Sequence, residues 1–123
     1  MDHINTANTI NNLATTYDSQ GKYDEAIAQY ERALRIKENA FGVDHINTAK
    51  TITNIGLFHL SQGRMQLASE YLSRGYSIFQ PNLGVTHPLT QKSKFLLAEL
   101  SKNAENKSAR KGNWRPNIKK LFK

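Results

Sequence analysis

The amino-acid sequence repeats itself with a period of 42 residues. The pentapeptide His-Ile-Asn-Thr-Ala occurs at residues 3–7 and again at 45–49, and His87 begins a third, more divergent copy. Gly21 recurs as Gly63 in the same register. A period of this length is typical of stacked structural units, because each unit is too small to bury its apolar face alone. The chain is therefore expected to fold as a stack of similar units.

Each unit is expected to be a pair of antiparallel helices joined at a glycine. In the first unit, apolar residues recur at helical spacing on both sides of a Ser-Gln-Gly-Lys turn. They are Ile10, Leu13, Ala14 and Tyr17 before the turn, and Tyr23, Ala26, Ile27, Tyr30, Ala33 and Leu34 after it. Ala14 and Ala26 are small enough to let the two helix axes approach closely. We expect these ten residues to form the core of the first unit.

The later copies follow the same plan less faithfully. The expected core positions of the second copy are Ile52, Ile55, Gly56, His59, Met65, Ala68, Leu72, Gly75 and Tyr76. The third copy offers a single helix, which is expected to bury Phe95, Leu97, Ala98 and Leu100. No second helix pattern follows it. A lone closing helix is the expected end of such a stack, because the last inner face needs a cover.

The pattern predicts five helices, over about 5–19, 22–39, 47–61, 64–80 and 88–102. Asn5 or Thr6 is expected to cap the first helix. Lys37 suits the C-terminal end of the second helix, because a cation there interacts favourably with the helix dipole. Pro81 is expected to stop the fourth helix, since proline cannot donate to the helical hydrogen-bond ladder. Pro88 suits the first position of the fifth helix.

These residues resemble the tetratricopeptide repeat. The positions that match the family's signature are Leu13, Ala14, Tyr17, Gly21, Tyr23, Ala26, Tyr30 and Ala33. The 42-residue spacing is similar to that of the subclass found in kinesin light chains. His59, Leu72 and Gly75 depart from the signature in the second copy, and we expect them to weaken packing there.

The resemblance implies an all-α fold, in which antiparallel helix-turn-helix repeats stack as a short right-handed α-solenoid. The expected organisation is a repeat domain over 1–102, followed by a basic, disordered tail over 103–123. Within the domain, the repeats cover about 4–42 and 46–84, and a closing helix covers 88–102. The chain begins at what is elsewhere a joint between repeats. Either the array begins abruptly or the sequence is a piece of a longer array, and we favour the second interpretation.

The resemblance also implies a function, since the first helix of each repeat in this family lines a concave groove that receives a segment of a partner protein. The groove positions would be Asn8, Asn11, Asn12, Thr15, Asp18, Lys50, Thr53, Asn54, Leu57, Ser61, Lys92, Phe95, Leu96 and Glu99. An asparagine amide offers a donor and an acceptor, which suits pairing with a peptide backbone. Two adjacent asparagines inside a helix lower its stability, which favours a binding role. The family's carboxylate clamp is not expected, because only Asn54 and Lys92 match its residues.

The net charge of +7 is confined to one end of the chain. Residues 1–101 carry nine basic and nine acidic side chains, whereas residues 102–123 carry eight basic side chains and one acid. Trp114, Ile118, Leu121 and Phe122 are spaced as one face of a helix. Three interpretations of the tail remain open: a disordered end, a helix folded back on the last repeat, or a basic amphipathic helix.

The basic amphipathic helix supports an alternative function, in which the chain associates with nucleic acid or an anionic membrane through the tail alone. The tail residues proposed for this role are Lys111, Trp114, Arg115, Lys119 and Lys120.

Catalytic and metal-binding functions are not expected. The chain has no cysteine, and it lacks the Gly-rich phosphate loop and the common hydrolase motifs. His3, His45 and His87 occupy equivalent joints one repeat apart, too distant to share an ion, and His59 is expected to be a core residue. We therefore expect a cytoplasmic protein with a protein or peptide partner, and with no cofactor, metal or small-molecule substrate.

Overall fold

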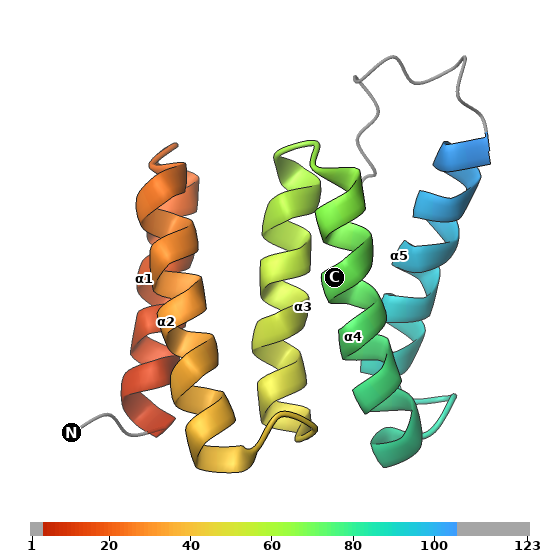
Figure 1. The fold of residues 1–123 in the computed structure, drawn as a ribbon, viewed down its shortest axis with the longest axis horizontal. Coiled ribbons are helices and arrows are strands. Elements are labelled where there is room, and N and C mark those ends of the chain that lie inside the picture. Colours follow the sequence, from red (N-terminus) through yellow and green to blue (C-terminus); the bar gives the residue numbers. More distant parts are fainter. Residues whose placement is uncertain (1–3, 106–123) are drawn as a thin grey trace.

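The computed structural model describes residues 4–105, which form five α-helices and no strand (Figure 1). They are α1 (Ile4–Ser19), α2 (Tyr23–Phe41), α3 (Ile46–Ser61), α4 (Met65–Leu83) and α5 (Pro88–Glu105). The bounds of α3 and α4 lie 42 residues after those of α1 and α2. The prediction of an all-α stack of helix pairs is therefore confirmed.

The helices lie side by side in a row that runs from the α1–α2 pair to α5 (Figure 1). α1 packs mainly on α2, α3 packs on both α2 and α4, and α5 packs on α4. The largest buried cluster lies where α1, α2, α3 and α4 meet, and a second joins α3, α4 and α5. Each helix thus depends on its neighbours in the chain for burial, as expected for a repeat stack.

Glycines close the second helix of each pair. Gly42 and Gly84 have φ values of 93° and 88°, in the left-handed region that glycine adopts without steric cost. Their backbone N–H groups donate to the carbonyl oxygens of Glu38 and Gln80, respectively. These bonds satisfy carbonyls that a helix end otherwise leaves unpaired.

Histidines cap the helices that follow these glycines. The Nδ1 atom of His45 accepts from the backbone N–H of Asn47 at 3.0 Å, and that of His87 accepts from Leu89 at 3.1 Å. The ring of Phe41 stacks on His45, with the centroids 4.5 Å apart. The prediction that the joint histidines are cap residues is confirmed at these two positions, and His3 lies outside the described residues.

Two predicted helix ends are wrong. Asn5 and Thr6 lie inside α1, which begins at Ile4, so neither is its N-cap. Pro81 lies inside α4, which continues to Leu83. The proline withholds only its own N–H from the ladder, and the Asn82 side-chain amide donates to the carbonyl of Ile78 at 2.7 Å in the same turn.

The core prediction fails at Leu13 and Tyr23, whose side chains are 40% and 43% exposed. Leu13 corresponds to Ile55, which is fully buried in the cluster that α3 forms with α2. Among the described residues, no helix packs on the equivalent face of α1. Leu13 is exposed because that neighbour is missing there, although its local sequence is that of a core position.

The core prediction for α5 is also partly wrong. Phe95 is 50% exposed and Ala98 is exposed, whereas Leu100 is buried and Leu97 is partly buried. Ala98 corresponds to Ala14 and Gly56, which face the second helix of their own repeats. No second helix follows α5 within the described residues, so this face meets solvent.

The departures of the second repeat from the family signature are accommodated by packing. His59 is 5% exposed, which confirms that it is a core histidine, and Leu72 is fully buried. Gly75 is buried, and a Cβ atom there would lie 2.6 Å from Thr53 Oγ1. The threonine therefore fills the space that an alanine methyl would need.

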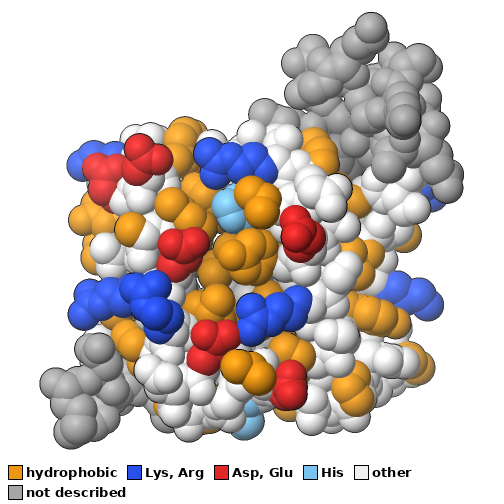
Figure 2. Space-filling model, in the orientation of Figure 1, with side chains coloured by type: hydrophobic (Ala, Val, Ile, Leu, Met, Phe, Trp, Pro, Cys, Tyr) orange, Lys and Arg blue, Asp and Glu red, His pale blue; other side chains and the backbone are white. Residues whose placement is uncertain are grey.

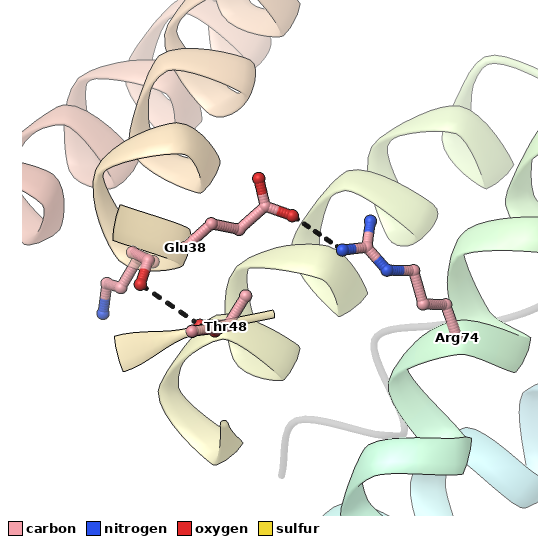
Figure 3. A network of polar contacts seen from close by, with 5 residues as sticks. Glu38, Thr48 and Arg74 are labelled. Carbon is pink, nitrogen blue, oxygen red and sulfur yellow. Dashed lines mark hydrogen bonds and ion pairs between the residues drawn. The ribbon is translucent and has the colours of Figure 1, made fainter. Parts of the chain in front are cut away.

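Polar contacts join the two repeats on either side of the α2–α3 joint (Figure 3). Thr48 Oγ1 donates to the carbonyl oxygens of Gly42 at 2.7 Å and of Lys37 at 3.4 Å. Arg74 of α4 forms an ion pair with Glu38 of α2, at 2.7 Å between Nη2 and Oε2. Both side chains of the ion pair are partly exposed, so it adds little stability, and it fixes the relative position of α2 and α4.

Candidate functional site

The asparagines of α1 and α3 meet in one hollow of about 390 Å³ between the two repeats. We name it the Asn–Lys hollow. It is lined by Asn8, Asn11, Asn12, Lys37, Asn47, Lys50, Thr51 and Asn54. Five of these eight residues were predicted groove positions, and the structure brings all five together. The hollow is lined by amides and two cations, and it has no acidic residue in its lining.

A second hollow of about 220 Å³ begins where the first ends. It is lined by Thr15, Asp18, Tyr30, Asn54, Leu57, Phe58 and Ser61, and we name it the Tyr30 hollow. Asn54 lines both hollows, so the two are contiguous. Together they form a groove along α1 and α3, in which one end is polar and cationic and the other is partly apolar.

Two of the asparagines are already engaged within the protein. Asn8 Oδ1 accepts from the Lys37 ammonium at 3.0 Å, which ties α1 to α2. Asn11 Nδ2 donates to Thr51 Oγ1 at 3.2 Å, which ties α1 to α3 across the repeat boundary. Asn12 and Asn54 are exposed, and their side-chain amides have no hydrogen bond within residues 4–105. These two amides are available to a ligand.

The charges in the groove are separated between its two ends. Burial lowers the pKa of the Lys37 ammonium below its usual value, and the positive charge of Lys50 lowers it further. At the other end, burial raises the pKa of the Asp18 carboxyl. The groove therefore presents a cationic hollow next to one that contains an acid.

The groove does not extend to the closing helix as predicted. Lys92 lies outside both hollows. Leu96 is a core residue, 2% exposed, and the hydroxyl of Thr53 is directed at α4, near Gly75. The tail residues Lys111, Trp114, Arg115, Lys119 and Lys120 lie outside the described part of the chain.

Side chains decide why the groove ends there. The positions of the second and third copies that correspond to Thr15, Asp18, Tyr30, Asn54 and Phe58 are Leu57, Leu60, Leu72, Leu96 and Leu100. These leucines form the cluster between α3, α4 and α5. The leucine set therefore fills the space that remains open as the Tyr30 hollow one repeat earlier.

Sequence reasoning missed Lys37, Asn47 and Thr51 as lining residues. Asn47 and Thr51 belong to the first turns of α3, and Lys37 belongs to the second helix of the first repeat. Lys37 was predicted to serve the end of α2, but that helix continues to Phe41. Alignment of the repeats carried the signal, since the position equivalent to Lys37 is the buried Phe79.

The surface outside the groove has mixed charge. Figure 2 shows one face of the molecule, on which Lys and Arg side chains are interspersed with Asp and Glu. This mixture agrees with the balanced charge of residues 1–101. Within residues 4–105, no helix has the length and hydropathy needed to cross a bilayer. In the same range, no three metal-binding side chains cluster together.

The stacked helix pairs and the groove along their first helices define a helical-repeat protein. The family model described as tetratricopeptide repeat matches residues 6–47, which cover the first helix pair and the start of α3. The chain is thus a tetratricopeptide repeat protein, with a second repeat that follows from the 42-residue period and the equivalent helix bounds. No curated protein matches the chain. Tetratricopeptide repeats generally mediate protein–protein interaction and serve as non-enzymatic scaffolds.

Proposed function

We propose that this protein is an interaction scaffold that binds an extended segment of a partner protein in the groove along α1 and α3. The observation that carries the proposal is the pair of exposed amides on Asn12 and Asn54, which come from successive repeats and line the same hollow. An amide offers both a donor and an acceptor, as a peptide backbone requires. Asn54 also lines the Tyr30 hollow, so a segment bound to it has access to both.

The position of these asparagines in helices supports a binding role. Asparagine is a poor helix former, and alanine at the same exposed site favours the helix by several tenths of a kcal/mol, about 0.5–0.7. Neither amide contributes a hydrogen bond within the described residues that would offset this cost. A pairing with a partner's backbone supplies the missing benefit.

The test measures peptide binding to variants of the full chain. Each of Asn12→Ala and Asn54→Ala is expected to lose about 0.5–1.5 kcal/mol of binding free energy. The melting temperature should stay unchanged or rise slightly, because alanine is the better helix former. The probes are acetylated, amidated nonapeptides selected for binding from a randomised pool, and affinity is measured by fluorescence anisotropy.

Asn39→Ala is the matched control, since Asn39 is an exposed asparagine of α2 that lines neither hollow. It should leave peptide affinity unchanged. The proposal fails if the Asn12, Asn54 double variant binds every selected peptide as tightly as the unmodified chain.

A further inference from the structure

Lys37 occupies a place that the repeat architecture normally gives to an apolar side chain. Its counterpart in the second repeat, Phe79, is 1% exposed and belongs to the main core. Lys37 is itself only 5% exposed. A lysine at such a site loses hydration that an apolar residue never had, so it lowers stability unless its charge is compensated.

The described residues compensate this charge poorly. The ammonium donates one hydrogen bond, to the neutral oxygen of Asn8, and lies 6.0 Å from the centroid of the Phe41 ring. An ammonium has three donors, and no carboxylate within residues 4–105 forms an ion pair with it. The nearest charge that affects it is Lys50, which has the same sign.

The ammonium lines the Asn–Lys hollow together with Lys50. The other lining residues are asparagines and one threonine, which carry no charge. Two cations in a partly enclosed, otherwise neutral space create a positive potential that attracts an anion. The hollow has about 390 Å³ of space, more than ten times the roughly 30 Å³ that one water molecule occupies in the liquid.

We propose that the Asn–Lys hollow is a binding site for the carboxylate of an aspartate or glutamate side chain within the partner segment, and that Lys37 and Lys50 bind this carboxylate. This inference rests on the proposed function, and it names the chemistry of the partner. A side chain fits better than a chain end, because the groove continues past Asn54 into the Tyr30 hollow. A segment that occupies both hollows must pass through the first.

The Tyr30 hollow sets the second half of the preference. Its lining includes the apolar side chains of Leu57 and Phe58 together with the carboxyl of Asp18. A second acidic side chain there would meet a like charge, which disfavours binding. The groove therefore selects an acidic side chain at one end and an apolar side chain at the other.

The anion site is tested without a peptide, by titration of the full chain with sodium acetate while NMR follows its side-chain amides. Acetamide, which has the same shape without the charge, is the matched neutral probe, and sodium chloride keeps the ionic strength constant. Acetate should shift the amide signals of Asn8, Asn11 and Asn47 in a saturable way, with an affinity about tenfold above that of acetamide. Equal affinities, or acetate shifts that do not saturate, would overturn the proposal.

Charge-removing variants assign the effect to its residues. Lys37→Met should lower acetate affinity to within about twofold of acetamide, and it should raise the melting temperature, because it removes a buried charge. A purely structural lysine would instead lower the melting temperature on substitution. Lys94→Met, at an exposed lysine of α5, should change neither quantity. Retention of acetate discrimination by Lys37→Met would contradict the assignment.

Two amidated and acetylated nonapeptide pools distinguish this inference from the proposed function. One pool has glutamate at its centre and the other has glutamine, with identical randomised flanks. The glutamate pool should be retained about tenfold better, and Lys37→Met should abolish the difference. Equal retention of both pools would overturn the acidic preference while the groove function stands. Saturable acetate binding with neither pool retained would uphold the anion site and overturn peptide binding.

A third pool, with central glutamine and a free C-terminal carboxylate, identifies the source of the anion. It should be retained no better than the amidated glutamine pool. Retention equal to that of the glutamate pool would overturn the assignment to an internal side chain in favour of a chain end.

Discussion

His59 shows how a single buried polar residue makes stability depend on pH. The side chain stacks on Tyr71, with ring centroids 5.5 Å apart, and its Nδ1 has no hydrogen-bond partner among the described residues. Burial lowers the pKa of its imidazole from 6.5, Arg64 lowers it further, and Glu31 partly opposes them. The folded state therefore favours the neutral ring.

The sign of the pH effect follows from this shift. Since the folded pKa lies below the unfolded value, the contribution of His59 to stability is present above pH 6.5 and is lost as pH falls through the folded pKa. His59→Phe removes this titration. Urea denaturation from about pH 7.5 to about pH 5 should show a smaller loss of stability in the variant than in the unmodified chain. Parallel pH profiles for the two proteins would refute this assignment.

At the scale of the element, Pro81 is the main defect of α4. The ring removes the N–H that would donate to the carbonyl of Ser77, four residues earlier, yet the helix continues to Leu83. Pro81→Ala restores this donor and should stabilise the protein by about 1–3 kcal/mol. Thermal denaturation followed by circular dichroism measures the change.

Asn39 is the matched control for this substitution, because it is the equivalent residue of α2 and already has its N–H. Asn39→Ala should gain only the propensity difference, about 0.5–0.7 kcal/mol. A gain no larger for Pro81→Ala than for Asn39→Ala would show that the missing donor has no measurable cost.

At the scale of the whole molecule, stability comes from contacts between neighbouring helices. With two helix pairs and one closing helix, we expect a free energy of unfolding near the low end of the usual range of about 5–15 kcal/mol. Equivalent positions should then differ in importance according to whether a neighbour covers them.

Leu13 and Ile55 provide the comparison, since they occupy the same position in successive repeats. Ile55→Ala should cost about 2–5 kcal/mol, because it opens a cavity in the main core. Leu13→Ala should cost less than about 1 kcal/mol, because its side chain is 40% exposed. Urea denaturation of both variants measures these costs, and similar values for the two would contradict the packing described here.

The sequence by itself predicted the helices and their pairing. The 42-residue period, the glycines at the turns and the spacing of Ala14, Ala26 and Tyr30 are local features, and the backbone responds to them within a few residues. The convergence of the groove asparagines also followed, because equivalent positions on equivalent helices face the same way. Helix ends were less predictable, since Pro81 is tolerated near the end of α4.

Only the tertiary structure decided which equivalent positions are alike in their surroundings. Leu13 and Ile55 have the same local pattern, but α2 covers only Ile55. Lys37 lies on the helix that sequence reasoning assigned to packing, and it enters the groove because the hollow between α1 and α3 opens beside Asn8. Burial depends on which neighbouring surface is present and how its side chains fill the space between, and a local sequence pattern does not contain that information.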